Sequence, residues 1–220
     1  ATTAEIGNGY EACTKTARVF DFPPQAPIIR FLDTRGLGEV NYDPAADISF
    51  CEGRSRLILA VMKALDLEQR AVLDIVGAVR RRHPEWPVVV AQTTLHEAYS
   101  AGVGHVLPYP FTATPVTAVP PDLARALAYQ RSLFELLLGR GVPHFVPIDF
   151  THVDDGLEPP AYGREALLDT LIAAAPAAVA VALAELPGAT PGSAEPANAH
   201  ILGFALAAGG QAGVVRLLEL

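Results

Sequence analysis

The stretch that decides the fold is residues 28–36, IIRFLDTRG. An apolar run interrupted only by Arg30 leads to Asp33, and Gly36 follows three positions later. Short apolar runs bounded by turn residues are typical of strands buried inside a sheet. The sequence therefore predicts a buried strand that ends at Asp33 and brings an Asp-x-x-Gly turn to the edge of a sheet.

Strand-like and helix-like segments alternate on both sides of this stretch. Residues 17–22 are predicted to form an edge strand in a hairpin with the strand that ends at Asp33. The remaining predicted strands are 56–65, 87–91 and 142–148, and the predicted helices are 67–83, 122–138 and 163–175. This alternation predicts an α/β fold with a mostly parallel sheet and flanking helices. Two segments lack periodicity, the predicted loop 34–54 and a proline-punctuated insertion at 100–121.

Composition limits the function classes. The 220 residues carry a net charge of −8, and the only basic cluster, residues 80–82, is expected to form the last turn of a helix. No nucleic-acid partner is therefore predicted. Two cysteines, Cys13 and Cys51, are too few for a disulfide framework, which favours a reducing cytoplasm.

The composition changes after Ala175. Residues 176–220 are rich in Ala and Gly, and a linker-like segment at 187–193 separates two apolar stretches, 171–184 and 201–215. Each stretch is shorter than the roughly 20 residues that span a bilayer. We expect a packed helical hairpin, with a membrane-associated hairpin as the alternative. The predicted units are thus an α/β domain over 1–175 and a helical region over 176–220.

The run DTRGLGE at residues 33–39 resembles the DTPGLGE run of the Era-like, translation-factor class of bacterial P-loop GTPases that carry a C-terminal hydrophobic helical region. The resemblance covers residues 9–175. It implies that Asp33 lies near a Mg²⁺ ion bound with GTP and that the N–H of Gly36 faces the γ-phosphate. Thr14 resembles the threonine that joins the magnesium shell in this family, and Thr16 is a rival for that role.

The same resemblance implies a guanine site after the third buried strand. Aligning Thr93 with the first position of the Asn/Thr-Lys-x-Asp motif puts His96 where the family has the base-reading Asp. A neutral imidazole offers one hydrogen-bond acceptor, where a carboxylate offers two. Glu97, one residue later, is the alternative replacement for the base-reading Asp. The segment Asp149-Phe150-Thr151 takes the position of the loop that packs on the base.

The P-loop itself is missing from the sequence. It requires a Gly-Lys-Ser/Thr triplet, but neither of the two lysines, Lys15 and Lys63, follows a glycine. We therefore expect the natural start to lie upstream, with a gap left between the strand that ends at Asp33 and the strand at 56–65. That gap predicts poor stability of this fragment. The missing P-loop predicts no hydrolysis by it, because nothing cradles the β-phosphate. Leu37 occupies the place of the water-orienting Gln of some GTPases, which predicts slow turnover even in a full-length protein.

Two functions compete at this point. The first is a GTP/GDP-binding switch that hydrolyses Mg-GTP in its full-length form. The alternative is a non-enzymatic GTPase-like scaffold for protein or membrane contacts. The partners expected besides the nucleotide are a protein bound through residues 100–121 and a membrane contacted by the C-terminal helices. The expected location is the cytoplasm, with a peripheral or anchored position at the inner membrane as the alternative.

Overall fold

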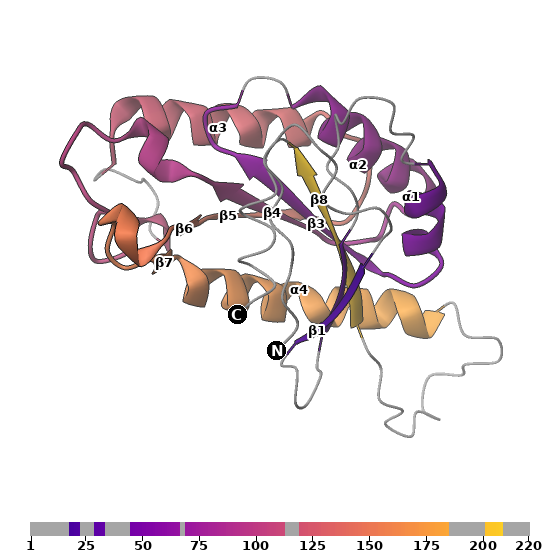
Figure 1. Cartoon of the computed structure of the whole chain (residues 1–220). Coiled ribbons are helices and arrows are strands. Elements are labelled where there is room, and N and C mark those ends of the chain that lie inside the picture. The colour runs from indigo at the N-terminus through magenta and orange to yellow at the C-terminus, as the bar shows by residue number, and fades with distance from the viewer. Residues whose placement is uncertain are drawn as a thin grey trace.

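The computed structural model describes residues 18–22, 29–33, 45–66, 69–112, 119–184 and 201–208. A six-stranded sheet with the order β1-β2-β8-β3-β4-β5 forms the centre of the molecule (Figure 1). β1 runs antiparallel to β2, and the other neighbouring pairs are parallel. The strands are β1 (Arg18–Phe22), β2 (Ile29–Asp33), β3 (Leu57–Lys63), β4 (Val88–Thr93), β5 (Pro143–Pro147) and β8 (Ile201–Ala208). The predicted α/β fold with a mostly parallel sheet, flanking helices and an N-terminal hairpin is confirmed.

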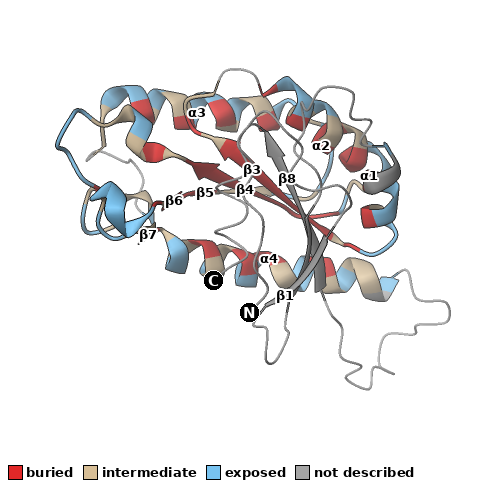
Figure 2. Cartoon of the chain, viewed as in Figure 1, coloured by how far each residue is buried: buried red, intermediate tan, exposed pale blue. Residues whose placement is uncertain are grey.

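In the described parts of the chain, four α-helices cover the two faces of the sheet. α1 (Ala45–Glu52), α2 (Arg70–Arg82) and α3 (Pro121–Glu135) lie on one face, and α4 (Arg164–Ala184) lies on the other (Figure 1). Apolar side chains alternate between the faces along β3, so that Ile58 packs toward α2 and Leu59 toward α4. Both layers are buried (Figure 2), which explains why β3 and β4 are continuously apolar.

The position of β8 corrects two expectations. β8 lies between β2 and β3 and pairs in parallel with both, so no gap separates those strands. The expectation of poor stability rested on that gap and loses its basis. The helix predicted over 201–215 is also wrong for residues 201–208. Alanine favours helices in isolation, but pairing with a strand on each side outweighs that intrinsic preference.

Two further differences concern helices. Residues 45–52, predicted as part of a loop, form α1, whose Ile48 and Cys51 side chains pack into the α2 side of the core. The helix predicted over 163–175 continues without a break to Ala184 and includes the first apolar stretch of the tail. Four residues at helical spacing bury one face of α4 against the sheet: Leu167, Leu171, Ala174 and Ala178.

Tertiary hydrogen bonds fix the ends of β3 and β4 relative to α3. The buried Gln92 amide donates to Oε1 of Gln130 at 2.8 Å, and Gln130 in turn donates to the Lys63 carbonyl at 2.6 Å. At the opposite end of the sheet, Arg80 is buried and donates to the carbonyls of Leu138 and Gly141 at 2.9 and 3.0 Å. The basic cluster does form the last turn of α2, and Arg80 holds the α3–β5 connection in place.

β5 is the outer strand of the sheet, and its exposed edge is protected. The N–H of Ile148 donates to Gln92, so alternate residues face β4, while the Pro147 carbonyl accepts a hydrogen bond from the Tyr109 hydroxyl at 2.7 Å. The backbone groups of Pro143 and Pro147 face away from β4, toward the open edge, and a proline has no N–H to donate to another strand. The edge of β5 is therefore unsuited to pairing with a further chain, and Tyr109 attaches the insertion to it.

Candidate functional site

Two predicted segments meet at the carboxyl ends of β4 and β5. The chain leaves β4 at Thr93, turns through Thr94 and enters a short 3-10 helix, Leu95–Ala98. Thr94 has a φ of 55°, in the left-handed region that β-branched residues rarely adopt. Such strain persists only where surrounding contacts hold it, and it is common at binding sites. Ligands of open α/β sheets bind at this end of the strands, which makes the turn the candidate site.

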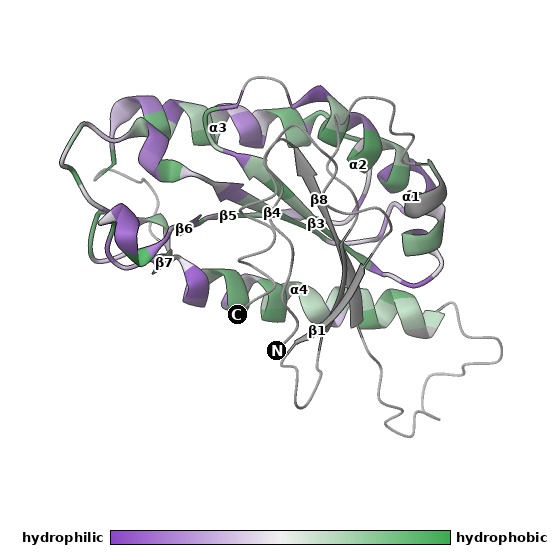
Figure 3. Ribbon diagram, viewed as in Figure 1, coloured by the Kyte–Doolittle hydropathy of each residue, from purple (hydrophilic) through white to green (hydrophobic). Residues whose placement is uncertain are grey.

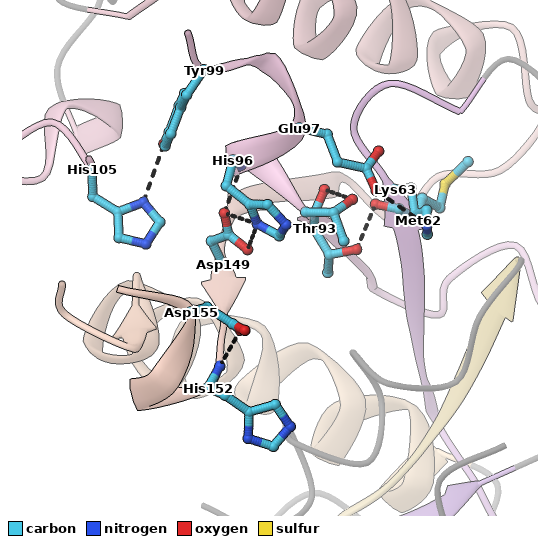
Figure 4. A network of polar contacts seen from close by, with 11 residues as sticks. Met62, Lys63, Thr93, His96, Glu97, Tyr99, His105, Asp149, His152 and Asp155 are labelled. Atoms are coloured by element: carbon cyan, nitrogen blue, oxygen red, sulfur yellow. Dashed lines mark hydrogen bonds and ion pairs between the residues drawn. The ribbon is translucent and has the colours of Figure 1, made fainter. Parts of the chain in front are cut away.

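The contact between His96 and Asp149 joins the two segments (Figure 4). Asp149 belongs to β6 (Asp149–Phe150), which pairs with β7 (Ala161–Tyr162), and it is only 1% exposed. One carboxylate oxygen accepts the backbone N–H of His96 at 2.7 Å, and Nδ1 of the ring lies 2.9 Å from both oxygens. A buried carboxylate requires such partners, so Asp149 fixes both the main chain and the ring of His96.

Glu97 points away from this pair. Its carboxylate lies 3.3 Å from Nζ of Lys63, at the end of β3, and both side chains are partly exposed (Figure 4). An exposed pair of this kind contributes about 0–1 kcal/mol to stability. The Thr93 hydroxyl is directed toward β3 as well, where it donates to the Met62 carbonyl at 3.3 Å.

The remaining predicted site residues lie elsewhere. Phe150 packs against the α4 side of the core, and Thr151 is buried with its N–H bonded to the Pro160 carbonyl. Asp33 ends β2 opposite Ala205 of β8, which is itself opposite Leu59 of β3. The backbone of Asp33 is therefore level with Leu59, four residues before Lys63 along β3. Thr14 and Gly36 fall outside the described residues, as does Thr16.

Sequence reasoning missed an aromatic cluster behind Asp149. The His105 ring stacks on Tyr162 at 4.2 Å between centroids, and the Tyr99 hydroxyl lies 3.3 Å from its Nδ1. Nε2 of His105 is buried and has no hydrogen-bond partner among the described residues. Tyr162 donates to the Val106 carbonyl at 2.8 Å. The sequence carries no local signal for this cluster, because Tyr162 lies far along the chain from the insertion it holds.

Burial governs the ionisation of the cluster. It lowers the pKa of His105, an effect that the Asp149 carboxylate opposes and that His96 reinforces. Burial also raises the pKa of Tyr162 to about 12, with the charge of Asp149 adding to the shift. His105 is therefore neutral in the folded protein near neutral pH.

The neutral state of His105 predicts a dependence of stability on pH. Because the folded state binds this proton more weakly than the unfolded state, stability is retained above the unfolded pKa of about 6.5 and falls as the pH is lowered. The slope contributed by one proton cannot exceed about 1.4 kcal/mol per pH unit. Urea unfolding between pH 7.5 and about 5 measures it, and His105→Phe, which keeps a ring against Tyr162, is expected to reduce the slope. An unchanged slope in this variant would assign the pH dependence to other groups.

A cavity of about 530 Å³ opens beside the insertion. Its walls are formed by Leu107–Tyr109 and Thr112 on one side and by Pro159, residues 161–166 and Asp169 on the other. Residues 107–112 of the insertion thus lie next to β7 and the start of α4, with a hollow between them. Within the described residues, no three His, Cys, Asp or Glu side chains cluster in a way that could hold a metal ion.

α4 is the one helix, within the described residues, that is long and apolar enough to cross a membrane by length and composition. Its second half is mostly hydrophobic, interrupted by Pro176, while its charged residues lie in the first turns (Figure 3). The same helix packs one face on the sheet, as core helices of globular domains do.

Comparison of the chain with protein-family models, with curated proteins and with solved structures found no match.

Proposed function

We propose that this protein is a GTP-binding domain of the P-loop GTPase type, which hydrolyses Mg-GTP in its full-length form and acts as a switch. The observation that carries the proposal is the contact of His96 with Asp149. These residues come from the two segments, 53 positions apart, that the resemblance assigns to the base. Their meeting at the carboxyl ends of parallel strands agrees with the position expected for a ligand of an open α/β sheet.

The arrangement of the sheet gives further support. A nucleotide laid along the carboxyl ends of the strands would have its base near His96 and its phosphates toward β8 and β2. Asp33, and Thr14 before β1, would hold the Mg²⁺ that neutralises the phosphates, and Gly36 would respond to the γ-phosphate. Leu37 stands after Gly36, where some GTPases have a water-orienting Gln, so slow turnover is expected.

A second candidate, a non-enzymatic scaffold, draws on different observations. Ile172 is 64% exposed on the outer side of α4, and Ala173, Ala177 and Ala180 are exposed on the same helix. Together with the cavity beside residues 107–112, this face offers apolar surface to a protein or a membrane. In this function the replacement of the base-reading Asp by His96 would be a sign of lost nucleotide binding.

Magnesium-dependent binding of a fluorescent GTP analogue separates the two functions. The titration uses the 220-residue chain and any longer natural chain that includes residues before Ala1, with EDTA as the magnesium-free control. The GTP-binding proposal predicts binding that requires Mg²⁺ and weakens at least tenfold in Asp33→Ala, but not in Asp74→Ala, an exposed carboxylate on α2. Absent or magnesium-independent binding would favour the scaffold.

A further inference from the structure

Asp149 cannot read a base itself. It is 1% exposed, and its two oxygens are occupied by the backbone N–H and the ring of His96. The group that this pair presents to the outside is the His96 ring, whose side chain is 35% exposed. No described residue forms a hydrogen bond with its second nitrogen, Nε2.

The carboxylate also determines which nitrogen of His96 carries the proton. An ionised carboxylate only accepts hydrogen bonds, so Nδ1 must be the protonated nitrogen in the neutral ring. Nε2 then carries a lone pair and is a single hydrogen-bond acceptor. The left-handed turn at Thr94 and the bond from the His96 N–H to Asp149 fix the main chain below the ring, so this acceptor has a defined direction.

The other carboxylate of the turn does not supply a second acceptor beside Nε2. Glu97 extends toward Lys63 on β3, while His96 extends toward Asp149 on β6 (Figure 4). One neutral acceptor can accept a single hydrogen bond, either from N1–H of guanine or from the N6 amino group of adenine. It cannot form the paired bonds to N1–H and the N2 amino group by which a carboxylate selects guanine.

Resting on the GTP-binding function proposed above, we propose that His96 is the base-reading residue of this site, that Asp149 positions it, and that the site takes both purine nucleoside triphosphates. One neutral hydrogen bond to either base is equivalent to about a tenfold change in affinity or less. GTP and ATP are therefore expected to bind with dissociation constants within about tenfold of each other. Inosine triphosphate, which lacks the N2 amino group, is expected to match GTP.

Displacement of a fluorescent GTP analogue by GTP, ATP and inosine triphosphate, in Mg²⁺, tests the selectivity. His96→Ala is expected to weaken all three by a similar factor of about three to ten, because each loses one hydrogen bond. Asp149→Asn keeps the shape but turns an amide N–H toward Nδ1, which moves the ring proton to Nε2. That donor suits N1 of adenine and repels N1–H of guanine, so the preference is expected to shift toward ATP. Glu97→Gln, on the same turn, is expected to leave the selectivity unchanged.

Nitrogen-15 NMR of the histidine rings tests the positioning step without a nucleotide. The expected result is protonation of His96 at Nδ1 in the native protein and at Nε2 in Asp149→Asn; the reverse assignment would overturn the proposal. A preference for GTP over ATP above about a hundredfold would overturn the base-reading role of His96 and leave GTP binding intact. The same conclusion would follow if such a preference disappeared in Glu97→Gln. Binding of no triphosphate at all would overturn both this inference and the proposed function.

Discussion

Asp149→Ala is expected to lower the free energy of unfolding by about 3 kcal/mol. The substitution leaves the backbone N–H and the ring N–H of His96 without their buried acceptor, and net hydrogen bonds to a charged group contribute about 1.5–3 kcal/mol each. Removing the buried carboxylate also removes its desolvation cost, which offsets part of that loss. Urea denaturation followed by circular dichroism gives the change as a shift in midpoint.

Asp154→Ala is the matched control for this measurement. Asp154 lies five residues further along in the exposed turn Val153–Asp155, and its removal is expected to change stability by less than about 0.5 kcal/mol. If Asp149→Ala were as mild as its control, the contact with His96 would not contribute to the folded state. The central position given to that contact would then be wrong.

Gly141→Ala is expected to destabilise the protein by about 3 kcal/mol for a steric reason. A Cβ atom at position 141 would lie 2.2 Å from the carbonyl oxygen of Trp86 and 2.8 Å from its carbonyl carbon. Both are main-chain atoms just before β4, and the Gly141 N–H is bonded to the Pro84 carbonyl at 2.8 Å. The clash can be removed only by a shift of the backbone at Trp86 or at Gly141, whose carbonyl accepts a hydrogen bond from Arg80. Overpacking of this kind costs about 1–3 kcal/mol or more.

Gly104→Ala provides the opposite expectation. No heavy atom lies within 4 Å of a Cβ built there, and its φ is outside the left-handed region. Alanine at such a position stabilises by roughly 0.5 kcal/mol, since it restricts the unfolded chain. Thermal unfolding of both variants compares the two signs directly. A Gly141→Ala protein as stable as the wild type would contradict the close approach of residues 86 and 141.

Much of the fold follows from local sequence. The continuous apolar runs of β3 and β4, and the helical spacing of Val72, Val76 and Val79 in α2, predict their elements, because each buries its apolar groups where its own period directs them. The hairpin of β1 and β2 was predicted from two strands joined by a proline-rich turn. These elements are determined by short-range pattern and by the need to bury one or both faces.

The elements that sequence did not predict depend on distant partners. β8 has an alanine-rich composition that favours a helix and becomes a strand only between β2 and β3. The candidate site joins two segments that the sequence singles out, but their contact depends on tertiary packing. The sequence identified the segments after β4 and β5. It did not indicate that Asp149 is buried and contacts His96. No sequence pattern links His105 to Tyr162 either, because a stacking contact between distant segments produces no periodicity in the sequence.

The measurement that tests the central claim most directly is the mapping of Mg-GTP onto the backbone amides by NMR. Binding at the candidate site predicts shifts at the carboxyl ends of the strands, at Lys63, Thr93, His96 and Asp149. Leu57 and Val88, at the opposite ends of β3 and β4, are expected to stay unchanged. Shifts confined to other parts of the molecule, or no shifts at saturating nucleotide, would contradict a nucleotide site built around His96 and Asp149.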